Sequence, residues 1–141
     1  MQLDYMVLAD YVRQDSGVVH IMGAGIDTIQ APHLPAVQQL GVALRISFDA
    51  ADQVGQQHRV KLSFVGPQHS VLTAEAVLVT PPHPPEVPEH WRIGLGVALQ
   101  MPVPLPAYGD YTCELAIDDG SEIDPRSIDF RVIPTPGQSQ G

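Results

Sequence analysis

The sequence predicts an all-β fold, an immunoglobulin-like antiparallel β-sandwich of about eight strands. The apolar residues occur in short alternating runs, as two packed sheets require. The chain contains 14 prolines and 12 glycines, too many for a helical bundle because each interior proline costs about 3 kcal/mol. Turn residues recur between the runs at the spacing of a sandwich.

The chain begins with a predicted β-hairpin. Leu3 to Arg13 alternates as a strand but carries apolar residues on both faces. The turn residues at 14–17 lead to a return strand, Val18 to Met22. The second apolar face is either covered by the segment Ile26 to Pro35 or open to a partner.

A glycine motif follows the hairpin. Gly23-Ala24-Gly25-Ile26-Asp27 comes after a strand and resembles the start of a dinucleotide-binding loop. Thr28 stands where the third glycine is required, and Pro32 and Pro35 prevent the helix whose N-terminus would hold the pyrophosphate. We therefore expect a glycine bulge and a short edge segment, Ile26 to Gln30.

Three strands are expected in the middle of the chain. Val42 to Asp49 and Arg59 to Phe64 alternate cleanly, so each should be half-buried. Val71 to Thr80 is also predicted as a strand, because its flanking turns and β-branched residues outweigh a helical interpretation. This third strand is apolar on both faces, like the hairpin.

The clearest alternation runs from Trp91 to Met101, after a polyproline-like loop at Pro81 to Pro88. We expect Pro102, Pro104 and Pro106 to end this strand.

Two further strands complete the predicted sandwich, Tyr108 to Ile117 and Ile128 to Val132. The chain has no internal repeat and no long linker, so residues 1–134 are expected to form one domain. Residues 135–141 are expected to be a disordered tail.

Pro106-Ala107-Tyr108-Gly109-Asp110-Tyr111-Thr112-Cys113 resembles the start of strand F in immunoglobulin-like domains, where a tyrosine two residues before a cysteine forms the tyrosine corner. Two features depart from the antibody pattern. Cys113 is the only cysteine, and Trp91 comes too late to be the strand-C tryptophan. The resemblance therefore implies an immunoglobulin-like architecture and not an antibody-type domain.

A second resemblance spans most of the chain. Leu3-Asp4-Tyr5, Leu8-Ala9-Asp10-Tyr11 and Ile21-Met22-Gly23-Ala24-Gly25-Ile26-Asp27 are similar to the opening of a family of uncharacterised bacterial proteins. That family also ends in a Gly-x-Tyr strand and a short strand like Phe130-Arg131-Val132. The resemblance implies a bacterial origin and a compact β domain, and it carries no activity.

The composition argues against several classes of partner. Seven basic residues against 16 acidic ones give a net charge of −9, so neither nucleic acid nor an anionic membrane surface is an expected partner. The first residues do not form a signal peptide, and no apolar run approaches the ~20 residues of a membrane-spanning helix. We expect a cytoplasmic protein.

Two groups of residues are candidate metal ligands. The closest histidine pair is His83 and His90, with Glu86 or Glu89 as the carboxylate, but the spacing of a zinc site is missing. Asp118, Asp119, Glu122 and Asp124 crowd one loop without the calcium-binding spacing of an EF-hand. The other interpretations are polar loop histidines and a solvated acidic turn, so no metal or other cofactor is assigned.

No catalytic residue is assigned either. Cys113 shares a face with Tyr111, Leu115 and Ile117, which should be the core, and a buried thiol is inert. No serine stands in a Gly-x-Ser-x-Gly elbow. The expected function is therefore a non-enzymatic protein-binding or assembly module that associates with another protein or with a second copy of itself. The alternatives are a metal-dependent protein or enzyme that uses the loop histidines and carboxylates, and a structural component of a phage or other large assembly.

Overall fold

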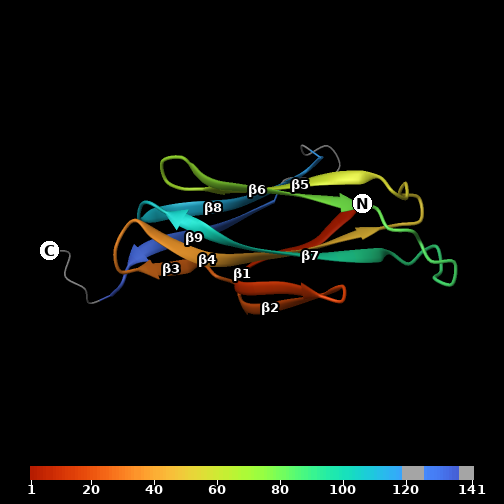
Figure 1. Cartoon of the computed structure of the whole chain (residues 1–141), viewed down its shortest axis with the longest axis horizontal. Helices are drawn as coiled ribbons and strands as arrows, with labels where there is room; N and C mark the ends of the chain where they lie inside the picture. The colour runs from red at the N-terminus through yellow and green to blue at the C-terminus, as the bar shows by residue number, and fades with distance from the viewer. Residues whose placement is uncertain (119–125, 137–141) are drawn as a thin grey trace.

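The computed structural model describes residues 1–118 and 126–136, in which nine strands form two packed sheets (Figure 1). The predicted all-β sandwich is confirmed. Sheet A has the strand order β2-β1-β4-β7, and sheet B has the order β3-β9-β8-β5-β6. The strands are β1 (Gln2–Asp15), β2 (Val18–Ala24), β3 (Thr28–Ala31), β4 (Ala36–Phe48), β5 (Gln57–Val65), β6 (Ser70–Val79), β7 (Ile93–Leu105), β8 (Gly109–Ile117) and β9 (Arg126–Pro134).

The main hydrophobic core lies between the two sheets and draws on both. The alternation in β5 shows why, because Val60, Leu62 and Phe64 are buried while Arg59 and Lys61, which alternate with them, are exposed. Strand β8 contributes the four residues predicted to share its inner face, which are Tyr111, Cys113, Leu115 and Ile117.

One strand pair departs from the antiparallel prediction. Strand β3 pairs with β9 in parallel, from Thr28 opposite Arg131 to Ala31 opposite Pro134. The next strand, β4, belongs to sheet A, so the chain crosses between the sheets over residues 32–35. That crossing leaves β3 beside the last strand and not in a hairpin with its neighbour in sequence.

Strand β7 is longer than predicted at one end and shorter at the other. It starts at Ile93, so Trp91 lies outside it, and it continues through Pro102 and Pro104 to Leu105. The prediction that these prolines end the strand is wrong. Strand β7 is at the edge of sheet A and pairs only with β4, so a missing backbone N–H is tolerated on its free side.

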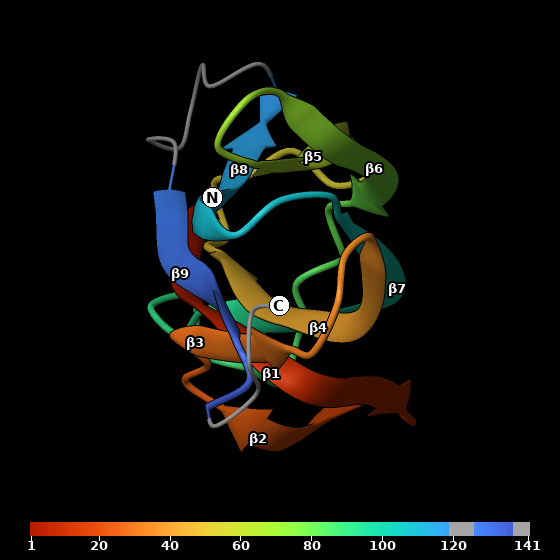
Figure 2. The same ribbon diagram turned by 90° about the vertical axis from the view of Figure 1, so that its left-hand side faces the viewer.

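The β1–β2 hairpin is the outer part of sheet A and folds back over the outer face of β4 and β7 (Figure 2). Strand β1 pairs with β4 as far as Ala9 and then with β2. Ala9 and Val12 pack on Ala43 of β4 and form a second small hydrophobic core. From Leu40 to Leu44, β4 is therefore buried on both faces and not half-buried as predicted. The inner face of the hairpin is covered by β4 and β7, not by Ile26 to Pro35.

Small residues on β4 and β7 make room for the hairpin. A Cβ atom added at Gly41 would lie 2.7 Å from a methyl group of Val12, and one added at Gly96 would lie 2.5 Å from a methyl group of Val19. Gln100 of β7 bonds to the β1 backbone, accepting from the Val12 N–H at 2.9 Å and donating to the Asp10 carbonyl at 3.1 Å. Its side chain thus replaces a strand partner for β1 at this point.

The predicted tyrosine corner is present at the start of β8. The Tyr111 hydroxyl donates to the Ala107 carbonyl at 2.7 Å and accepts from the Ala107 N–H at 3.2 Å. The ring is buried and stacks on Phe130 of β9, with ring centroids 5.4 Å apart. This contact fixes the turn before β8, as the corner does in immunoglobulin-like domains.

Candidate functional site

Two loops meet at one end of the sandwich, at the right of Figure 1. Residues 49–56 follow β4, and residues 80–92 follow β6. The Thr80 N–H donates to the Gln56 carbonyl and the Gly55 N–H donates to the Thr80 carbonyl, each at 2.9 Å. We call these two loops, together with Asp118 at the end of β8, the loop end.

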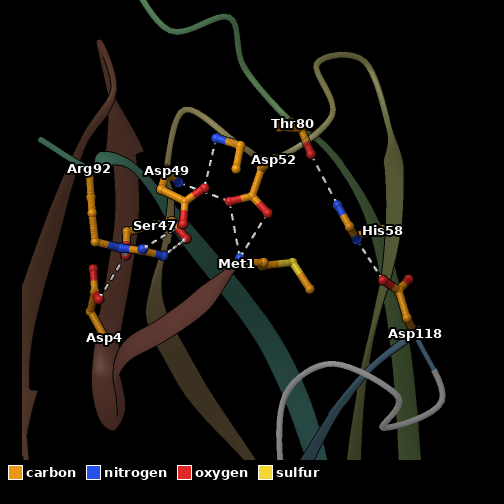
Figure 3. A network of polar contacts seen from close by, with 10 residues as sticks. Met1, Asp4, Ser47, Asp49, Asp52, His58, Thr80, Arg92 and Asp118 are labelled. Carbon is orange, nitrogen blue, oxygen red and sulfur yellow. Dashed lines mark hydrogen bonds and ion pairs between the residues drawn. The ribbon is translucent and has the colours of Figure 1, made fainter. Parts of the chain in front are cut away.

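Arg92 fastens the second loop to sheet A (Figure 3). Its guanidinium donates to the hydroxyl and to the carbonyl of Ser47, each at 2.8 Å, and lies 3.5 Å from a carboxylate oxygen of Asp49. The Ser47 hydroxyl in turn donates to Asp4 of β1 at 3.0 Å, and Asp4 forms an ion pair with Arg45. The hydroxyl and the carbonyl of Ser47 therefore both have hydrogen-bond partners. A satisfied network of this kind favours one fixed conformation of the loop.

Asp52 fixes the shape of the first loop. Its carboxylate accepts from the Met1 amino group at 3.0 Å and from the Asp49 N–H at 2.8 Å (Figure 3). Burial raises the pKa of Asp52, but these bonds and the positive charges of the Met1 amine and Arg92 outweigh it, so the net pKa lies below 3.8. The carboxylate is ionised at neutral pH.

His58 lies on the inner side of β5 between Thr80 and Asp118 (Figure 3). Its Nδ1 lies 2.5 Å from an Asp118 oxygen, and its Nε2 lies 3.0 Å from the Thr80 hydroxyl. Burial raises the pKa of Asp118, but the hydrogen bonds from His58 and the Arg59 N–H lower it by a larger amount. The net pKa therefore lies below 3.8. Because the carboxylate is ionised and can only accept, Nδ1 is the donor of this pair.

This hydroxyl, imidazole and carboxylate have the connectivity of a hydrolase triad. Thr80, in the position of the nucleophile, is only 2% exposed. The neighbouring hollow of about 340 Å³ is lined by Gln57, His58, Arg59, Val77 and Asp118, without Thr80. The hydroxyl is therefore buried, and the three groups tie together β5, the end of β8 and the loop after β6.

His58 is buried, unlike the other five histidines, and packs beside Phe48 with ring centroids 5.9 Å apart. The signal was present in the sequence, because His58 continues the alternation of Val60, Leu62 and Phe64 and so falls on the inner face.

The candidate zinc ligands are not gathered around a common point. His83 lies with Nε2 3.0 Å from the Trp91 carbonyl, and the His90 ring packs edge-on against the Trp91 ring at 6.2 Å. Glu86 and Glu89 are exposed. Across residues 1–118 and 126–136, no three His, Cys, Asp or Glu side chains are placed to hold a metal ion.

The remaining candidates from the sequence are the acidic loop that begins at Asp118 and the thiol of Cys113. Of the acidic loop, only Asp118 falls in the described part, and Asp119, Glu122 and Asp124 lie outside it. Cys113 is buried in the core, and burial together with the Glu114 charge raises the pKa of its thiol to about 12. At neutral pH the thiol is protonated and a poor nucleophile.

Trp91 is the largest of the exposed apolar side chains at the loop end. It is 57% exposed, although its backbone is fixed by its N–H bond to the Pro88 carbonyl at 2.9 Å and by the contact between its carbonyl and His83. The sequence placed Trp91 in a strand, because its parity matches that of the residues after it. The turn that begins at Pro88 removes it from that strand.

A comparison with known families places the chain. The DUF6941 family, a family of unknown function, covers residues 4–133. The chain belongs to the DUF6941 family. This confirms the predicted membership of a family without known activity, and no curated protein matches the chain. In the described residues of this DUF6941 protein, no helix is long and apolar enough to cross a membrane.

Proposed function

We propose that this chain is a non-enzymatic protein-binding module and that its partner docks on the loop end. The observation that carries the proposal is the exposed side chain of Trp91 on a loop fastened by Arg92. Tryptophan is buried to a large extent in most proteins and is enriched among the residues that dominate interface energies. A loop held in one conformation also loses less conformational entropy on binding.

The charge of the loop end favours a basic partner segment. Asp49, Glu86 and Glu89 are exposed around the two loops, and the chain as a whole carries a net charge of −9. The nearby guanidinium of Arg92 is already engaged by Ser47 and Asp49. A lysine or arginine of the partner would meet these carboxylates and the face of the indole ring, a cation–π contact worth about 0.5–2 kcal/mol.

The order of the strands supports an immunoglobulin-like assignment for the sandwich. If β4, β5, β7, β8 and β9 are equated with strands B, C, E, F and G, the two sheets contain the same neighbours as in that class. The loop after B, residues 49–56, then corresponds to a loop at the end that variable domains use for recognition. Fold analogy alone assigns no partner, so it adds to Trp91 and does not replace it.

The remaining expectations stay predictions from the sequence. These are a bacterial origin, a cytoplasmic location and the absence of nucleic-acid and membrane partners. We do not propose the metal-dependent alternative, because His83, His90 and a carboxylate do not converge in the described residues.

The test is the affinity of the full chain for fluorescently labelled lysine- and arginine-rich peptides, with acidic peptides of equal length for comparison. We expect binding of the basic peptides that weakens with salt and falls at least about tenfold in Trp91→Ala. The matched control is Val37→Ala, which alters an apolar residue that is 67% exposed at the far end of β4. Equal loss in both variants, or no preference for basic peptides, would contradict the proposal.

A further inference from the structure

Strand β2 leaves one long free edge on the molecule. It is the last strand of sheet A, and its outer side pairs with no strand of the described chain. All seven residues from Val18 to Ala24 are exposed or half-exposed. Gly23 has a φ of 70°, so the regular edge runs from Val18 to Met22, roughly 17 Å of unpaired backbone donors and acceptors at about 3.3 Å per residue.

The other three free edges each carry a feature that discourages strand addition. Strand β3 has only four residues and is followed by Pro32 and Pro35. Strand β7 exposes Pro102 and Pro104, and β6 exposes the charged Glu75 in its middle. Short strands, prolines and charged side chains are the usual means by which edges avoid pairing, and β2 has none of them.

The surface beside this edge is unusually apolar. Four of the ten exposed large apolar side chains in the described part of the chain lie on the β1–β2 hairpin, namely Tyr11, Val18, Ile21 and Met22. Met22 is 69% exposed and lies directly opposite Tyr11 in the hairpin. A partner strand added at β2 would cover these side chains as well as the backbone edge.

Charge decides which partner fits. A chain with a net charge of −9 repels a second copy over most of its surface. Strand β2 contains no Asp, Glu, Lys or Arg, and His20 is its only ionisable side chain. Two copies can therefore pair antiparallel along β2 in any register without setting one carboxylate against another.

We propose that a second copy of this chain occupies the β2 edge, in a two-fold symmetric dimer. The register centred on Ile21 sets Ile21 opposite Ile21 of the second copy and His20 opposite its Met22. The row Val12–Ile21 of one copy then continues into the same row of the other. Two four-stranded sheets become one continuous sheet, and the symmetry closes the assembly at two chains. This inference is independent of Trp91 and the loop end.

The experiment is the molar mass by light scattering at several concentrations, for the wild type and two variants. The wild type should rise with concentration from 15.2 kDa towards twice that mass. Ile21→Glu sets two carboxylates face to face in the dimer and should stay at 15.2 kDa. Val77→Glu, which adds the same charge on the free edge of β6, should behave as the wild type. A wild type that remains monomeric, a mass that grows beyond two chains, or a dimer lost only in Val77→Glu would overturn the proposal.

A second measurement needs no variant and covers the case in which Ile21→Glu disturbs the hairpin. Amide hydrogen exchange of the wild type is followed at concentrations where the mass reports monomer and dimer. Protection that rises with concentration should be confined to Val18 to Ala24 and the β1 residues opposite them. Protection that appears on β6 or β7 instead would overturn the proposal.

Discussion

The attachment of the β1–β2 hairpin to sheet A should depend on Gln100. Replacing it with alanine removes the acceptor for the Val12 N–H and the donor to the Asp10 carbonyl. Val12 is buried, so its N–H would lose its partner without gaining water, at a cost of about 1–3 kcal/mol. The bond at the more exposed Asp10 carbonyl adds about 0.5–1.5 kcal/mol. We expect Gln100→Ala to destabilise the docked hairpin by roughly 2–4 kcal/mol.

The assay is amide hydrogen exchange across the hairpin, combined with urea unfolding. A loss of about 3 kcal/mol corresponds to roughly a hundredfold faster exchange of the hairpin amides if the hairpin opens locally. Gln100→Glu keeps the acceptor and loses the donor, so it should fall between the wild type and Gln100→Ala. The matched control is Gln39→Ala, an exposed glutamine of β4, which should change stability by less than about 0.5 kcal/mol. Equal exchange rates in Gln100→Ala and Gln39→Ala would show that Gln100 does not hold the hairpin on sheet A.

Three further predictions concern the core and the loop end. Tyr111→Phe should lower the free energy of unfolding by about 1–3 kcal/mol in urea titrations, because the partly buried N–H and carbonyl of Ala107 lose their partner. Tyr108→Phe, which loses one bond at a half-exposed position, should cost less, and the reverse order would contradict the tyrosine corner. The pKa of Asp118 lies below 3.8, so the wild type should lose stability as the pH falls through that lowered pKa, and unfolding of Asp118→Asn followed against pH should show a shallower acid loss. Cys113 should not react with a thiol reagent at pH 8 until the protein is unfolded, since its pKa is about 12, and rapid labelling of the native protein would contradict its burial.

The sandwich itself was predictable because its strands are written in alternation. Val60, Leu62 and Phe64 bury one face of β5 while Arg59 and Lys61 remain outside, and this contrast survives without knowledge of the neighbours. The tyrosine corner was also readable, since it depends on residues close together in the sequence.

The packing of the β1–β2 hairpin over β4 and β7 could not be predicted in the same way. Whether the hairpin lies flat in the sheet or over it depends on contacts between Val12 and Gly41, which are far apart in the sequence. The sequence does show that the outer face of β4 and β7 is made of small residues, namely Gly41, Ala43, Gly96 and Ala98. This pattern predicts a packed hairpin only when β4 and β7 are known to be neighbours.

Two local errors have a similar cause. Pro102 and Pro104 were taken to end a strand, because the sequence does not tell whether a strand lies at an edge where a missing N–H is harmless. Trp91 was assigned to the strand by parity, whereas its backbone N–H is bound to the Pro88 carbonyl in a turn. The residue on which the proposed binding surface depends was therefore assigned to a strand and not to a loop.

Docking of a basic protein segment on the loop end, as we propose, can be followed through the fluorescence of Trp91 itself. It is the only tryptophan of the chain, so quenching of the tryptophan fluorescence by acrylamide measures the exposure of this one side chain. The free protein should be strongly quenched, because the side chain is 57% exposed. Saturation with a lysine- and arginine-rich peptide should protect Trp91 from acrylamide. A peptide that binds while the quenching of Trp91 stays unchanged would contradict the account.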